Sequence, residues 1–196
     1  MSLAIETVTG EALLPHVPAL SRLRATVFAE WPYLYQAKPD DEGRYLQHFI
    51  GETGAAIILA RDGAETVGAA TCQPMLTAHA PVRDAFTAAG RDLATHCYFG
   101  ESVLLPRYRG QGTGVAFFAA REAHARSLGL RFAAFCGVVR NVNDPRRPAD
   151  YTPLDAFWRK RGYTHHPEIS AVFRWRELEE EQETPHSLSF WIRELT

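Results

Sequence analysis

The most informative stretch of this chain is Arg109-Gly110-Gln111-Gly112-Thr113-Gly114. It lies between an apolar run over 98–105 and an alanine-rich segment over 115–128. Glycine lacks a Cβ, so such a loop can turn tightly and present several backbone N–H groups to one side. A helix that starts here adds unpaired amides and the positive end of its dipole. Together with the charge of Arg109, these features predict a site for the oxygens of a diphosphate.

Two common phosphate-binding loops fit this stretch less well. A P-loop needs a lysine and a serine or threonine after its last glycine, but Val115 and Ala116 follow Gly114. The dinucleotide fingerprint needs a further glycine where Phe117 stands. The remaining pattern is Arg-x-x-Gly-x-Gly after a strand that ends in Leu104-Leu105-Pro106. In that context it resembles the coenzyme loop of the GNAT superfamily of N-acetyltransferases; a glycine-rich turn without a ligand is the alternative.

The resemblance implies a coenzyme and a way of holding it. The loop would bind the pyrophosphate of acetyl-CoA through its main-chain amides, with no metal involved. The strand before the loop and the strand after the helix would splay apart, so that the first offers backbone groups to the pantetheine arm. The matching strand positions are Val103, Leu104 and Leu105, and the loop positions are Arg109, Gly110, Gln111, Gly112, Thr113 and Gly114.

The order of the predicted elements agrees with this family. Hydrophobic periodicity and turn signals predict strands over 3–8, 55–61, 65–73, 95–105, 131–139, 170–175 and 187–193. They predict helices over 13–29, 42–50, 82–93, 112–127 and 153–161. We therefore expect one domain over residues 1–196 with an α/β (α+β) GNAT fold. The resemblance implies a mixed central sheet of six to seven strands flanked by helices, with a splayed pair of parallel strands that holds acyl-CoA.

Composition narrows the classes of partner. The 196 residues carry a formal net charge of −2, so there is no broad basic field for nucleic acid. The three cysteines are far apart and form no CxxC pair, which argues against a zinc site or a disulfide framework. Neither a signal peptide nor an apolar run of about 20 residues is visible, so we expect a cytoplasmic protein without a membrane partner.

Glu101 is the candidate general base. It interrupts an apolar, aromatic strand, and a carboxylate in a partly apolar cleft can take a proton from an amine, directly or through water. An amine with a pKa near 10 needs such help at neutral pH. Many members of the family carry a catalytic glutamate at the matching position. An ion-paired strand glutamate without a catalytic role is the alternative.

This chain differs from the family at the residue that would donate a proton to the leaving thiolate. Many members place a tyrosine on the last helix, in a segment that reads roughly Leu-Tyr-x-Lys-x-Gly-Phe. Here 157–163 reads Phe-Trp-Arg-Lys-Arg-Gly-Tyr, so Trp158 takes the tyrosine position and its indole N–H cannot act as an acid. Tyr151 is the candidate that remains nearby, and protonation by water or stabilisation by hydrogen bonds are the alternatives.

The acceptor site is expected to have an aromatic wall. In this fold the segment after the first helix and the final hairpin enclose the acceptor, which places Trp31, Tyr33 and Tyr35, together with Tyr45, near it. Aromatic rings suit an apolar or cationic acceptor, although the same residues could form core or a homodimer contact. The acidic run over 177–183 is interpreted as a solvated hairpin loop.

These observations favour an N-acetyltransferase. It would move an acetyl group from acetyl-CoA to a primary amine of a small molecule or peptide by direct attack, because no cysteine sits in a convincing nucleophile setting. A non-catalytic acyl-CoA-binding sensor or regulatory domain is the alternative, and Trp158 is the residue that favours it.

Overall fold

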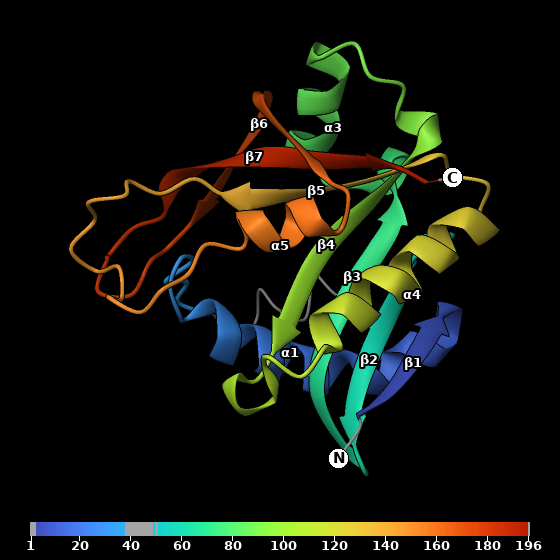
Figure 1. Ribbon diagram of the computed structural model, residues 1–196, viewed down its shortest axis with the longest axis horizontal. Helices are drawn as coiled ribbons and strands as arrows, with labels where there is room; N and C mark the ends of the chain where they lie inside the picture. Colours follow the sequence, from blue (N-terminus) through green and yellow to red (C-terminus); the bar gives the residue numbers. More distant parts are fainter. Residues whose placement is uncertain (1–2, 38–48, 50, 196) are drawn as a thin grey trace.

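The computed structural model describes residues 3–37, 49 and 51–195 and shows a seven-stranded sheet (Figure 1). The strand order is β1-β2-β3-β4-β5-β7-β6, and all neighbours are antiparallel except β4 and β5. The strands are β1 (Ala4–Thr9), β2 (Ala56–Asp62), β3 (Glu65–Pro74), β4 (His96–Leu104), β5 (Phe132–Val138), β6 (Thr164–Trp175) and β7 (Thr184–Glu194). The predicted mixed sheet with one parallel pair is confirmed.

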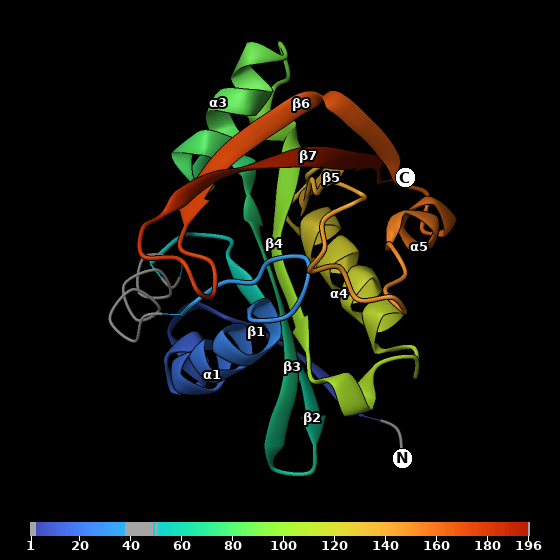
Figure 2. The ribbon, with the colours of Figure 1, turned by 90° about the vertical axis from the view of Figure 1, so that its left-hand side faces the viewer.

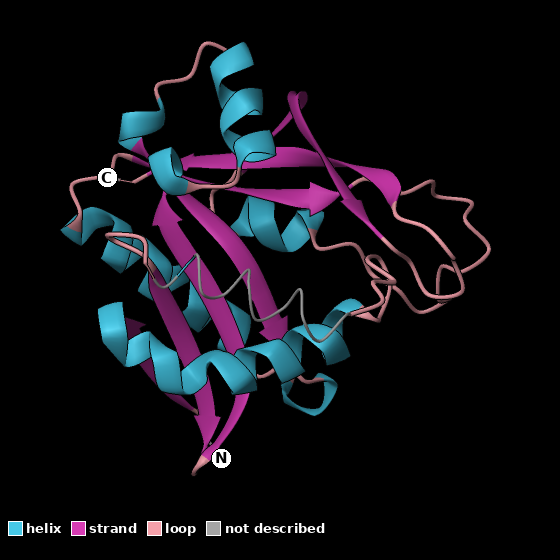
Figure 3. Cartoon of the chain, turned by 180° about the vertical axis from the view of Figure 1, so that it is seen from behind, coloured by secondary structure: helices cyan, strands magenta, loops and turns pink. Residues whose placement is uncertain are grey.

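Helices cover both faces of this sheet. Figure 2 shows α1 and α3 on one side of β4, and α4 and α5 on the other. The helices are α1 (Val17–Phe28), α3 (Ala80–Ala88), α4 (Thr113–Ser127) and α5 (Asp155–Lys160), with 3₁₀ turns η1 (Gly10–His16), η2 (Met75–Thr77), η3 (Leu93–Thr95) and η4 (Pro106–Tyr108). Seen from behind, α1 runs across β3 and β4 (Figure 3).

The central strands are apolar on both sides because both sides are covered. On β4, Phe99 belongs to the core under α4, Tyr98 to the core under α3, and Val103 to the core under α1. On β2, Ile58 and Ile57 likewise face opposite cores, and both are fully buried. Strands buried on both faces read as continuous apolar runs rather than as alternating ones.

Proline and glycine account for the main differences from the predicted element boundaries. The helix expected over 13–29 is divided into η1 and α1, since Pro15 lies inside the first piece and Pro18 starts the second. Helix α3 ends before Gly90, whose φ is +66°. Strand β6 starts six residues earlier than expected and takes up Pro167 in an irregularity of its pairing with β7. The helix expected over 42–50 lies outside the described residues, Phe49 apart.

Glu122 of α4 forms buried hydrogen bonds with residues of β7 and of the segment after α5. Its buried carboxylate accepts hydrogen bonds from the Tyr163 hydroxyl at 3.1 Å and from Arg193 Nη1 at 2.9 Å. Tyr163 follows α5 and Arg193 belongs to β7. One carboxylate therefore links three elements, and removing it leaves a guanidinium and a phenol without their acceptor.

We expect Glu122→Ala to lower the free energy of unfolding by about 3 kcal/mol, because it breaks a buried charge pair from one side. Urea denaturation followed by circular dichroism measures this loss. Glu65→Ala is the control, since its ion pair with Arg107 is exposed to solvent and should contribute little to stability. Equal effects of the two substitutions would contradict the assigned role of Glu122.

Candidate active site

The two parallel strands separate shortly after they meet. β4 and β5 pair over three rungs only, His96–Phe132, Cys97–Ala133 and Tyr98–Ala134. Beyond Tyr98, β4 pairs with β3 alone, whereas β5 continues with β7 as far as Val138–Leu188. In the part of the chain that the structure describes, the edge of β4 that faces β5 is therefore open from Phe99 onward. This is the splayed pair that the sequence predicted.

An extra residue in β4 sets the direction of Glu101. Cys72 of β3 pairs with Phe99 and Ala70 pairs with Ser102, so two residues of β4, Gly100 and Glu101, lie opposite Thr71. Such a bulge shifts the alternation of side chains by one position. Tyr98 and Glu101 consequently both face the side of α1 and α3, although an unbroken strand would point them to opposite faces.

Glu101 is paired with an arginine of α1. Its Oε1 contacts Arg24 Nη1, and both side chains are 11% exposed, which places the pair at the edge of the interior rather than in solvent. The Glu101 amide donates to the Thr71 hydroxyl at 2.9 Å, which anchors the bulge. Glu101 Oε2 is buried and accepts no hydrogen bond from a described residue. Glu101 is thus ion-paired, as the alternative interpretation expected. Its second oxygen, Oε2, remains available to a ligand, and a catalytic role stays a prediction.

The aromatic residues expected at the acceptor site pack around Tyr33 and Trp31, and their role in binding an acceptor stays a prediction. The Tyr33 ring lies 4.6 Å from that of Phe28 and 6.0 Å from that of Trp175, and burial raises the pKa of its hydroxyl, which stays protonated at neutral pH. Trp31 meets Tyr151 edge to face at 6.1 Å. Tyr35 lies farther along the same segment and pairs with Glu177 in an isolated β-bridge. Tyr45, also expected in this wall, lies outside the described residues.

A buried charge cluster holds this wall in place. Arg140 Nε donates to the Pro32 carbonyl at 2.6 Å and its Nη2 to the Tyr33 carbonyl at 3.0 Å, while Nη2 also pairs with Glu177. Glu177 is 2% exposed and contacts Arg146 as well. The reading of 177–183 as a solvated loop is therefore wrong for Glu177, because arginines from the β5–α5 connection neutralise it in the interior.

Tyr151 lies before α5 and also before the helix expected over 153–161. It lies in the connection before the helix, which begins only at Asp155. The residue is half-buried, and burial together with the neighbouring Asp155 raises the pKa of its hydroxyl. Arg147 covers its ring at 5.6 Å. The side chain is therefore a neutral phenol next to Trp31.

Trp158 fills the place where the family's tyrosine would lie. Its ring centroid is 5.1 Å from those of Phe135 and Trp191, in the core shared with α4. A Cβ added to Gly137 of β5 would lie 3.0 Å from the Trp158 ring. Close packing against β5 thus explains both the glycine and the tryptophan, and no hydroxyl is present at this position.

Two residues near the site were missed in the sequence. The Tyr98 hydroxyl lies 3.4 Å from Cys136 Sγ, a contact that joins β4 to β5 where they begin to separate. Burial raises the pKa of the Cys136 thiol to about 11, so it is not a thiolate at neutral pH. The signal that could have found Tyr98 is its position three residues before Glu101 combined with the intervening glycine, which permits a bulge.

The glycine loop begins α4 as predicted. Gly110 and Gly112 have φ values of +75° and +88°, and Gly112 is the N-cap of the helix without a side-chain cap. The Ala116 amide donates to the Gly112 carbonyl. Among the described residues, the amides of 110–115 have no hydrogen-bond acceptor, as expected for an anion site at the start of a helix.

Some predicted coenzyme contacts have protein partners. The Leu105 amide donates to the Val67 carbonyl at 3.0 Å, and the Leu104 carbonyl accepts from Arg109 Nε at 3.0 Å. Arg109 Nη1 also binds Glu30 at 2.8 Å, so the guanidinium extends toward α1. Val103 is fully buried. The free main-chain edge accordingly lies earlier in β4 than the expected 103–105, and coenzyme binding by these residues stays a prediction.

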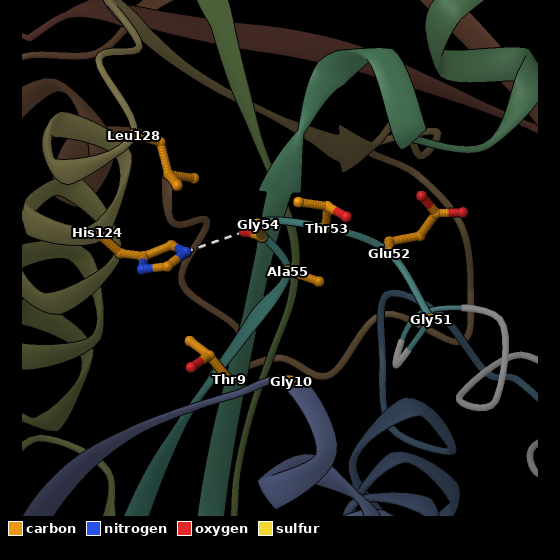
Figure 4. Close-up of a pocket in the computed structure, with 9 residues that line it drawn as sticks. All are labelled: Thr9, Gly10, Gly51, Glu52, Thr53, Gly54, Ala55, His124 and Leu128. Atoms are coloured by element: carbon orange, nitrogen blue, oxygen red, sulfur yellow. Dashed lines mark hydrogen bonds between the residues drawn. The ribbon is translucent and has the colours of Figure 1, made fainter.

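A separate hollow of about 440 Å³ lies at the other end of α4 (Figure 4). His124 and Leu128 of α4 form one side, and the His124 ring lies 2.9 Å from the Gly54 carbonyl. It is remote from the glycine loop, since α4 extends through 15 residues, or about 22 Å. Its other lining residues are Thr9, Gly10, Gly51, Glu52, Thr53 and Ala55.

Within residues 3–37, 49 and 51–195, no group of three histidine, cysteine or acidic side chains is placed to hold a metal ion. No helix in that part of the chain combines the length and apolarity needed to cross a bilayer.

Comparison with known proteins gives a family and a fold. The chain matches the family model described as the acetyltransferase (GNAT) family over residues 20–149. No curated protein is similar enough in sequence to match. Solved structures do match, and several of them cover nearly the whole chain.

Three of these structures illustrate the likeness. Acetyltransferase from Thermus thermophilus has a TM-score of 0.60 and 16% identity, covering 100% of this chain and 98% of its own. Ribosomal-protein-alanine N-acetyltransferase from Brucella melitensis gives 0.62 and 14%, covering 98% and 100%. PaiA N-acetyltransferase from Thermoplasma acidophilum, in complex with coenzyme A, gives 0.56 and 9%, covering 99% of both chains. At these identities the likeness concerns the fold alone.

We expect Gly112→Val to weaken acetyl-CoA binding about 10- to 100-fold, the loss of one or two hydrogen bonds to charged oxygens. A β-branched residue is strained at φ +88° and would project toward the phosphates. Isothermal titration calorimetry measures the affinity. Gly90→Val is the matched control, since Gly90 also has positive φ and open space around it but lies at the end of α3. Unaltered affinity in Gly112→Val would refute the loop assignment.

Proposed function

Since the chain belongs to the acetyltransferase (GNAT) family, we propose that it is an N-acetyltransferase that moves an acetyl group from acetyl-CoA to a primary amine. One observation carries this proposal: the bulge of β4 brings Glu101 to the α1 face of an open parallel strand pair, while the unpaired amides of 110–115 lie at the start of α4 on the opposite face. Coenzyme and acceptor can then approach the gap from different sides.

The reaction proceeds by direct attack. The amine nitrogen attacks the thioester carbonyl carbon, a C–N bond forms, and the C–S bond breaks. Glu101 accepts the proton that the nitrogen loses, directly or through water. A thiol intermediate is disfavoured, because Cys72 and Cys97 are fully buried and the pKa of the Cys136 thiol is raised to about 11.

Tyr151 is the residue that we assign to the leaving group. The coenzyme thiolate takes its proton from the Tyr151 hydroxyl, which burial and Asp155 keep protonated. No tyrosine is present on α5, where Trp158 packs against Phe135. Tyr151 lies against Trp31 at the acceptor wall, so its hydroxyl can approach the sulfur only from that side.

The acceptor is a small-molecule or peptide amine held between aromatic rings. Trp31, Tyr33 and Tyr35 form the wall, with Tyr35 in the part that joins it to β6 and β7. The name of the Brucella neighbour points to a protein terminus and leaves small amines open for this chain. The coenzyme A complex of the Thermoplasma neighbour supports acetyl-CoA as co-substrate. Its pyrophosphate would lie on the loop 109–114, whose amides are unpaired, and its pantetheine arm along the open edge of β4 before Val103.

Glu101→Gln should lower kcat/KM about 100-fold or more, the range for loss of a general base. It should leave the affinity for acetyl-CoA nearly unchanged, because the amide keeps the shape of the carboxylate. Thiol release from acetyl-CoA with a panel of amines measures turnover, and Glu168→Gln, a change of an exposed glutamate on β6, is the control. Full activity in Glu101→Gln would remove Glu101 from the mechanism. Tight coenzyme binding without turnover of any amine by the wild type would identify a sensor instead.

Arg140→Met should raise the KM for the amine about tenfold while the KM for acetyl-CoA stays within about twofold. The arginine binds the carbonyls of Pro32 and Tyr33 and so holds the acceptor wall, but it does not contact the glycine loop. Steady-state kinetics with each substrate varied in turn separate the two effects. Arg131→Met, which removes an exposed ion pair with Glu194, is the control. A rise confined to the KM of acetyl-CoA would contradict the proposal that Arg140 supports the amine-binding residues.

A further inference from the structure

Arg121 is a buried charged residue that the proposed mechanism does not use. It lies in the middle of α4 and is 2% exposed. Its Nε donates to the Phe117 carbonyl of its own helix at 3.3 Å, and its Nη1 donates to the Glu101 carbonyl of β4 at 3.3 Å. The side chain therefore crosses from the helix to the bulged part of the strand.

The guanidinium has aromatic neighbours rather than an acidic partner. Its central carbon lies 4.5 Å from the centre of the Phe99 ring and 4.9 Å from that of Phe118. No carboxylate of a described residue is within 4.0 Å, since the adjacent Glu122 is bound to Arg193 and Tyr163. Desolvation lowers the pKa of Arg121. Burying such a charge without an anion is unfavourable, and a well-packed apolar residue would usually stabilise the fold at least as well.

The position of Arg121 next to Glu101 suggests what the buried charge does. Glu101 is the residue of β4 whose direction depends on the bulge, and its two neighbouring peptide groups are held from different elements. Thr71 of β3 accepts the Glu101 N–H, and Arg121 of α4 donates to the Glu101 carbonyl. Two anchors hold both peptide planes around one Cα and so set the direction of the Cα–Cβ bond, while the contact with Arg24 holds the carboxylate at the end of the side chain.

We propose that Arg121 is a positioning residue that holds the β4 bulge, so that the Glu101 carboxylate stays directed at the acceptor amine. The inference rests on the proposed function for its effect on turnover, but the contact with the bulge stands independently of it. A displacement of about 1 Å in a reacting group can lower a rate about 100-fold. A donor that fixes the main chain therefore affects kcat without contacting either substrate.

Arg121→Met, which removes the donors and keeps much of the volume, tests this inference with two readouts. Amide hydrogen exchange at Glu101, followed by NMR, should accelerate at least about tenfold relative to the Phe99 and Val103 amides of the same strand. With a primary amine that the wild type acetylates, kcat should fall about 10- to 100-fold while the Kd for acetyl-CoA stays within about twofold. Arg126→Met makes the same change at an exposed position of α4 and should move neither readout.

Each outcome decides the matter. Faster exchange confined to Glu101 together with a lower kcat supports the positioning role. Unchanged exchange at Glu101, a uniform acceleration across β4, or faster exchange with unchanged kcat overturns it. Should the wild type acetylate no amine, the proposed function fails, and exchange at Glu101 alone decides whether Arg121 holds the bulge. If Arg121→Met does not fold, Arg121→Leu, which likewise carries no donor, is measured in the same way, and wild-type exchange in that variant overturns the inference.

Discussion

The structure depends on one extra residue in a strand. Side chains of a β-strand alternate between its two faces, so inserting one residue reverses the face of all that follow. Between Phe99 and Ser102 of β4 the chain has one residue more than the facing part of β3. As a result Glu101 shares a face with Tyr98 and contacts Arg24 of α1. The bulge also lies where β4 leaves β5, so the change of face and the opening of the sheet occur at the same place.

Local chemistry explains what the sequence revealed and what it did not. Alternating glycines after Arg109 predict a tight turn into a helix, because positive φ is a property of single residues, and the loop has that form. The sheet was predictable from apolar runs and turn signals. The burial of Glu177 was not, because it depends on Arg140 and Arg146 from a different loop. The acidic composition around Glu177 predicts that it is exposed to solvent, but its ion pairs with Arg140 and Arg146 bury it.

The charges around the gap are arranged in pairs, which bears on how a base could work there. Arg24 pairs with Oε1 of Glu101, which leaves Oε2 as the oxygen that a substrate could contact. The neighbouring Tyr33 and Cys136 are neutral at physiological pH because burial raises the pKa of each. An amine that enters this space therefore meets one carboxylate with an unoccupied oxygen, and the guanidinium groups of Arg24 and Arg140 lie nearby. Such surroundings disfavour an ammonium ion and favour the free amine that attack requires.

Rigidity around the gap comes from carboxylates that are buried outside it. Glu122 joins α4 to β7 through Arg193, and Glu177 joins the hairpin of β6 and β7 to the β5–α5 connection through Arg140. Neither carboxylate faces the open edge of β4, so both can be fully neutralised without removing a reactive group. The walls of the gap are thus fixed by ion pairs, while its interior keeps unpaired amides and the free oxygen of Glu101. This separation lets the same fold hold substrates in a fixed geometry and leave the reacting groups unsatisfied until the substrates arrive.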